Sequence, residues 1–267
     1  DNKHFMRLIG EYGLLLTESN RFEKGKKLLL LSIEICEKEK LQCPASWLNL
    51  GNAYLGLAMV KKAEQSFFRA MEIYEELNLF DHEYLLTINN LAHLYNKMGR
   101  TPDAIKILES GISRAEKLVS SREIDQVLVL LFANLAEGHI ANTDINQALI
   151  VAKKSLKKAE KLYGDESWHL RASLAVLGQV YMALEQYEEA IISLSRALEL
   201  TKNNKNDKSF DAYISMNLAI SYAYGGINED LAKPLYRKAL NNLESELGAN
   251  HPGLAPFLGH MASLEDD

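Results

Sequence analysis

Bulky and small apolar residues recur along the chain at helical spacing. Within residues 47–54, a ring, a Leu, a small residue and a second ring fall three or four positions apart, as Trp47, Leu50, Gly51 and Tyr54. Residues at such spacing share one face of an α-helix. A second apolar stripe covers residues 63–70, where Phe67 lies between two alanines. The pattern therefore predicts two helices joined by a short turn.

The same order of residue types returns at a regular distance along the chain. A weaker version comes first, with Ile9, Tyr12, Gly13, Leu16, Gly25, Leu29 and Ser32. Three fuller versions are Ile88, Leu91, Ala92, Tyr95, Ala104, Leu108 and Gly111; Phe132, Leu135, Ala136, His139, Ala148, Ala152 and Ser155; and Leu174, Leu177, Gly178, Tyr181, Ala190, Leu194 and Ala197. A sixth has Leu218, Ala219, Tyr222, Ala232, Tyr236 and Ala239. Such a fixed period indicates stacked helix pairs, because neither helix can bury its apolar stripe alone.

These slots resemble the tetratricopeptide repeat (TPR) pattern, in which small residues let the two helices approach and large ones fill the space beside them. The resemblance implies an all-α fold: a right-handed superhelical solenoid of antiparallel helix pairs. We expect six repeats and the first helix of a seventh, which would contain Leu258, Met261 and Ala262.

A single array over residues 1–267 is expected. Its repeats start near residues 6, 44, 85, 129, 171 and 212, and a partial one starts at 255. These steps are longer than the roughly 34 residues of ordinary TPRs. Together with the segment from Ile88 to Tyr95 and the lead from Gly248 to Pro252, they resemble the kinesin-light-chain-like TPR subfamily. The missing initial Met and the end at Asp267 in mid-pattern suggest a piece of a longer protein.

Composition excludes several function classes. The net charge of −6 over 267 residues does not favour capture of nucleic acid. The longest apolar runs, at residues 28–31 and 127–133, are too short to span a bilayer, so we expect no direct membrane insertion and a cytoplasmic location. Cys36 and Cys43 are the only two cysteines, and this low usage predicts reduced thiols.

No motif predicts catalysis or a metal. The chain lacks a Gly-rich phosphate loop, a zinc-type spacing of His or Cys and a nucleophile elbow. We therefore expect a protein that is not an enzyme and that carries no metal or cofactor.

Asparagines recur at one slot of the first helix in several repeats. If the register is right, this slot faces a concave groove, and it holds Asn49, Asn90, Asn134 and Asn217, with Val176 in the fifth repeat. A side-chain amide carries two donors and an acceptor, so it can pair with an extended peptide backbone of any sequence. The asparagines resemble the ladders by which several TPR proteins hold a peptide. Alternatively, they cap or solvate the helices, or fix the helix pair.

Neighbouring slots would complete the lining of this groove. The residues expected to contact a peptide, besides the four asparagines, are Asn52, Leu86, Asn89, His93, Glu137, Gln179 and Tyr213, and further apolar lining is expected from Leu48, Leu55, Ile140, Met182 and Met216. Lining of this kind predicts a ligand with apolar side chains, bound as an extended or helical segment.

Two functions follow from these features. The first is a scaffold or adaptor that binds a peptide segment of a partner protein in the groove, through an asparagine ladder and apolar pockets. The alternative is a regulatory or sensory module of a larger, peptide-responsive signalling protein. The incomplete last repeat is a candidate for self-association.

Overall fold

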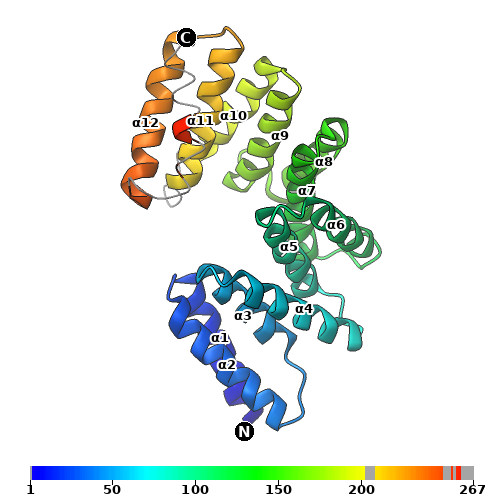
Figure 1. Cartoon of the computed structure of the whole chain (residues 1–267). Helices are drawn as coiled ribbons and strands as arrows, with labels where there is room; N and C mark the ends of the chain where they lie inside the picture. The colour runs from blue at the N-terminus through cyan, green and yellow to red at the C-terminus, as the bar shows by residue number, and fades with distance from the viewer. Residues whose placement is uncertain (1, 202–207, 249–253, 255–256, 260–267) are drawn as a thin grey trace. The chain divides into compact units, whose positions relative to one another are not determined.

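The computed structural model of the chain describes residues 2–201, 208–248, 254 and 257–259. This part is built from helices without a β-strand (Figure 1). The helices are α1 (Asn2–Glu18), α2 (Phe22–Lys38), α3 (Pro44–Gly56), α4 (Val60–Glu76), α5 (His82–Lys97), α6 (Thr101–Ala115), α7 (Arg122–Ala141), α8 (Ile145–Tyr163), η1 (Trp168–Leu170, 3-10), α9 (Arg171–Ala183), α10 (Tyr187–Thr201), α11 (Lys208–Tyr224) and α12 (Glu229–Leu247). The predicted all-α class is confirmed.

The chain forms two compact units, residues 1–134 and 135–267, and the division falls inside α7. In the first unit each helix from α1 to α6 packs against the next, and α3 also contacts α1 and α5. In the second unit α8 to α12 pack in the same order, and α9 also contacts α11. Packing of each first helix against the next first helix is what a stack of helix pairs requires. A single array over 1–267 stays a prediction, and Met261 and Ala262 of the expected seventh repeat lie outside the described residues.

Three first helices begin ahead of the expected repeat starts. Helices α5, α7 and α11 start at His82, Arg122 and Lys208, before residues 85, 129 and 212. At α5 the reason is a cap: the Asp81 carboxylate accepts hydrogen bonds from the backbone N–H groups of Glu83 (3.0 Å) and Tyr84 (3.1 Å). A carboxylate there satisfies donors that have no partner within the helix. The cap therefore extends the helix beyond the repeated slots.

The turn inside each helix pair has a recurring form. In the first five pairs a residue of positive φ follows the first helix: Asn20, Ala58, Gly99, Thr143 and Glu185. The next backbone N–H then bonds back to the carbonyl five residues earlier, for example Arg100 N to Tyr95 O at 2.8 Å. This left-handed ending satisfies carbonyls that the helix leaves unpaired. It gives the two helices of each pair the same reversal.

Close packing inside the pairs confirms the exchange of small and large residues. A Cβ added to Gly111 of α6 would lie 2.9 Å from Ile88 Cγ2 of α5, and one added to Gly178 would lie 2.6 Å from Leu194 Cγ. Ile88 and Leu194 are buried. The glycines are therefore needed for the approach of two helices, not for an unusual backbone.

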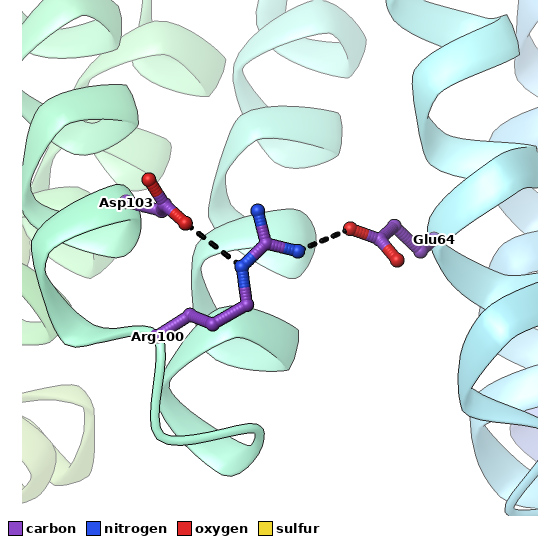
Figure 2. A network of polar contacts seen from close by, with 3 residues as sticks. All are labelled: Glu64, Arg100 and Asp103. Atoms are coloured by element: carbon purple, nitrogen blue, oxygen red, sulfur yellow. Dashed lines mark hydrogen bonds and ion pairs between the residues drawn. The ribbon is translucent and has the colours of Figure 1, made fainter.

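Polar contacts fix successive pairs in the first unit (Figure 2). The Arg100 guanidinium donates to Glu64 of α4 (2.7 Å) and to Asp103 of α6 (2.8 Å), and it lies 4.2 Å from the centroid of the Tyr95 ring. Arg100 thus joins the second helix of one pair to the second helix of the next. In the second unit, Arg196 and Glu160 make the corresponding link between α10 and α8 at 2.8 Å.

The prediction of reduced thiols is wrong. Cys36, near the end of α2, and Cys43, just before α3, form a disulfide with their Cα atoms 6.4 Å apart. The chain reverses between them through Lys40, which has a φ of +54°. This reversal brings the two Cα atoms within the range that a disulfide spans.

Helix α7 is, within the described part, the helix whose length and composition would allow it to cross a bilayer, and more than half of its apolar window is buried inside the protein. A buried core helix meets the same criterion. The expected lack of membrane insertion stays a prediction.

Candidate functional site

Four asparagines of the first unit form a chain of hydrogen bonds across α3, α5 and α7, which we call the amide network. Asn90 Nδ2 donates to Asn52 Oδ1 at 2.8 Å, Asn89 Nδ2 to Asn90 Oδ1 at 3.4 Å, and Asn134 Nδ2 to Asn89 Oδ1 at 2.8 Å. All four residues are half-buried. The network therefore links one first helix to the next through side chains that water can still reach.

The network leaves mostly donors unused. Each amide nitrogen carries two hydrogens, so Asn89, Asn90 and Asn134 keep one donor each and Asn52 keeps two. Among the oxygens, that of Asn134 accepts none of the bonds within the network. A surface with this inventory is suited to acceptors, such as the carbonyl groups of a peptide backbone.

The other predicted residues of the first unit lie beside the network without joining it. Asn49 and Leu86 are half-buried, and His93 is exposed. Burial among protein atoms, and then the charge of Lys97, lower the pKa of His93. An imidazole whose surface is open but whose surroundings are dense favours its neutral form, which offers one donor and one acceptor.

The second unit carries a different polar group, on α7, α9 and α11. Burial raises the pKa of Tyr213, and the charge of Glu137 raises it further, while the nearby amides of Asn217 and Gln179 lower it. Burial also raises the pKa of Glu137, although water reaches that residue. These four predicted residues are thus near enough to influence one another.

Asn217 differs from the asparagines of the first unit. Its Nδ2 atom is buried and makes no hydrogen bond within the described part of the chain. An unpaired buried amide is costly, so this group would gain from an incoming acceptor.

Two residues expected to line the groove do not reach a surface. Leu48 is 5% exposed and Met216 is 1% exposed, and both belong to the core. Sequence reasoning also left out the bonds among Asn52, Asn89, Asn90 and Asn134, because it treated the amides as independent. The signal that could have shown them is the adjacency of Asn89 and Asn90, which places two amides on neighbouring positions of one helix.

In the residues that the structure describes, no cluster of three or more His, Cys, Asp or Glu side chains could hold a metal ion. The assignment as a protein without enzymatic activity or cofactor stays a prediction.

Comparison with known proteins agrees with this architecture. Models of the tetratricopeptide repeat match residues 42–117 and residues 172–204. The Arabidopsis thaliana Protein KINESIN LIGHT CHAIN-RELATED 2 is 25% identical over 222 residues, 82% of this chain and 33% of that protein. The chain is a TPR protein of the kinesin-light-chain-like type. The resemblance seen in its repeated slots is therefore confirmed.

Another relative of this TPR protein is the mouse Outer dynein arm-docking complex subunit 4. It is 27% identical over 244 residues, which are 89% of this chain and 37% of the relative. The chain thus spans about a third of the length of these curated relatives.

Among solved structures, the apo form of the quorum sensor NprR from B. thuringiensis is similar, with a TM-score of 0.67 and 16% identity, over 99% of this chain and 77% of that one. NprR in complex with its cognate peptide NprX is similar with a TM-score of 0.61. At this identity the likeness shows a shared TPR fold.

Proposed function

We propose that this TPR protein is an interaction scaffold or adaptor that holds a peptide segment of a partner protein against the amide network. The observation that carries the proposal is the row of half-buried amides, bonded to one another from α3 through α5 to α7, with unused donors left over. Bonds between the amides fix their positions, so that little side-chain freedom is lost when a ligand binds.

The unused donors decide which part of the ligand is recognised. Backbone carbonyls repeat along every extended peptide, so amide donors fixed on successive helices can bind a segment largely irrespective of its side chains. Half-buried Leu55 and Leu86 and exposed His93 lie on the same two helices as Asn52, Asn89 and Asn90. They would give a preference for apolar or neutral side chains.

The docking-complex subunit supports the adaptor role, because its name assigns it to an assembly and its match covers most of this chain. The quorum sensor NprR, seen with a peptide, supports the alternative of a peptide-responsive regulatory module. Both share the peptide-holding surface and differ in what the bound state does. The adaptor comes first, because it needs only the residues of this chain.

A peptide-array screen with the purified chain tests the proposal. Segments that bind are then titrated against the double variant Asn90→Ala/Asn134→Ala. Loss of two backbone hydrogen bonds of about 1 kcal/mol each would weaken binding about 30-fold. The matched control is Asn142→Ala, which removes an exposed amide outside the network. Equal affinity of wild type and double variant, with unchanged circular dichroism, would mean that the asparagines only fix the helices.

A further inference from the structure

Helices α11 and α12 enclose a hollow of about 430 Å³ between them. Lys208, Asp211 and Ser215 line it from α11, and Leu235, Lys238 and Asn242 line it from α12. The volume lies within the range of small-molecule sites, roughly 300–1,000 Å³. Nothing in the proposed peptide-binding surface uses these residues.

The hollow arises from one departure from the repeated slots. The position of Ser215 is filled in the preceding repeats by larger residues: Trp47, Ile88, Phe132 and Leu174. In α5–α6, Ile88 fills the space beside Gly111. The equivalents in α11–α12 are Ser215 and Ala239, which both line the hollow. A serine therefore stands where the repeat places a side chain that closes the pair.

The rim of the hollow is positively charged. Neither Lys208 nor Lys238 has an ion-pair partner among the residues that the structure describes. The carboxylate of Asp211 is already engaged, with Arg171 Nη1 3.4 Å from its Oδ1 atom. Two ammonium groups thus face a space in which the acidic group is largely neutralised.

Hydroxyl and amide groups surround the same space. Ser215 Oγ donates to Asp211 O (2.8 Å) and Ser245 Oγ donates to Asn242 O (2.7 Å), while the Asn242 side chain also lines the hollow. The floor is apolar: Ala212, Ala239 and Leu235 belong to or pack against the core cluster of α11 and α12. The site thus offers an apolar floor beneath two cations.

We propose that this hollow binds a phosphate monoester with a small apolar body, whose dianionic group lies between Lys208 and Lys238 and whose body occupies the space above Ala212 and Ala239. Lysine acts as a point charge toward phosphate, so two lysines at one rim match a dianion. The apolar body takes the place of the large residue that the other repeats supply. The ester can be a free small molecule or a phosphorylated side chain of a partner.

Calorimetric titration of the full chain tests this site, with phenyl phosphate as the probe and with inorganic phosphate and phenol as probes of each half alone. We expect phenyl phosphate to bind at least tenfold more tightly than either half. Phosphotyrosine and tyrosine peptides of one sequence, titrated in parallel, distinguish a phosphorylated side chain from a free ester.

Variants locate the binding. Ser215→Leu fills the hollow and should abolish binding, whereas Ser215→Ala leaves it open and should preserve binding. Lys208→Gln/Lys238→Gln should weaken binding of phenyl phosphate at least tenfold and remove its salt dependence. Lys154→Gln, an exposed lysine of α8, is the matched control and should bind as wild type does.

Absence of phenyl phosphate binding to the wild-type chain, or equal binding by Ser215→Leu and wild type, would overturn the proposal. So would equal losses in Lys154→Gln and the double lysine variant. If Ser215→Leu does not fold, the lysine variants and Ser215→Ala still decide the question. The outcome is independent of peptide binding at the amide network.

Discussion

The pairs α5–α6 and α11–α12 follow one pattern of slots and differ in how they use it. In α5–α6, Ile88 closes the space beside Gly111, and Asn89 and Asn90 are bonded to neighbouring first helices. In α11–α12, Ser215 leaves a hollow, and the Asn217 amide nitrogen has no partner within the described part. The first pair is filled and internally bonded, whereas the second leaves space and an unused donor.

This contrast shows that a repeat can be kept while one of its slots is released for binding. The outer slots Leu218 and Ala219 stay buried in α11, so the helix pair is retained although Ser215 does not fill it. Substitutions that make each pair resemble the other test this view, and they are given below from the largest expected effect to the smallest.

Ile88→Ser should make α5–α6 resemble α11–α12 and cost about 4 kcal/mol of unfolding free energy, because it opens a void at a side chain that is 1% exposed. Urea denaturation followed by circular dichroism measures the loss. Ile192→Ser, at a residue that is 68% exposed, is the control and should change stability by less than about 0.5 kcal/mol. Similar losses in the two variants would show that the slot is not a packing position.

Asn89→Ala should cost about 1–2 kcal/mol, because it removes hydrogen bonds to both Asn90 and Asn134. Asn217→Ala should cost little or nothing, since it removes an amide nitrogen that is buried without a partner. The pair is compared by urea denaturation in one buffer. A larger loss for Asn217→Ala would contradict the difference between α5 and α11.

Ser215→Leu should make α11–α12 resemble α5–α6 and raise the unfolding free energy by about 1 kcal/mol, because it places apolar surface in the hollow. Ser215→Ala should leave stability nearly unchanged. Thermal unfolding measures both variants. A lower melting temperature for the leucine variant would mean that the hollow does not accept a side chain of this size.

Glu137→Gln should stabilise the chain at pH 7 relative to pH 4. The folded-state pKa of Glu137 is raised by burial, so its contribution to stability is full below the ordinary value of 4.5 and is lost as pH rises through the higher value. Glutamine removes this loss, by less than about 1 kcal/mol because water reaches the carboxylate. Unfolding at both pH values measures the effect, and a gain that is equal at pH 4 and 7 would contradict it.

Much of the fold could be predicted because it depends on local spacing. Apolar residues three and four apart indicate a helix wherever they occur, and small residues at matched slots, such as Gly111 beside Ile88, indicate where two helices approach. The helix starts were less predictable: the early start of α5 depends on the cap by Asp81, which lies outside the repeated slots.

The candidate site was predictable in its residue types and not in its bonds. Asn90 and Asn134 share one slot of the repeat, yet Asn90 bonds to Asn52 across 38 positions and Asn134 to Asn89 across 45. These partners depend on how adjacent helices are placed to within a fraction of a hydrogen-bond length, which spacing along the chain does not specify. Leu48 and Met216 are buried for the same reason.

By itself, the sequence determined that this protein is a TPR chain of antiparallel helix pairs, because helical periodicity and the exchange of small and large residues act over a few positions. Only the tertiary structure decided which asparagines pair, that Cys36 joins Cys43, and that Ser215 opens a hollow rimmed by Lys208 and Lys238. Each of these depends on side chains from different helices meeting in space, and their meeting is set by packing.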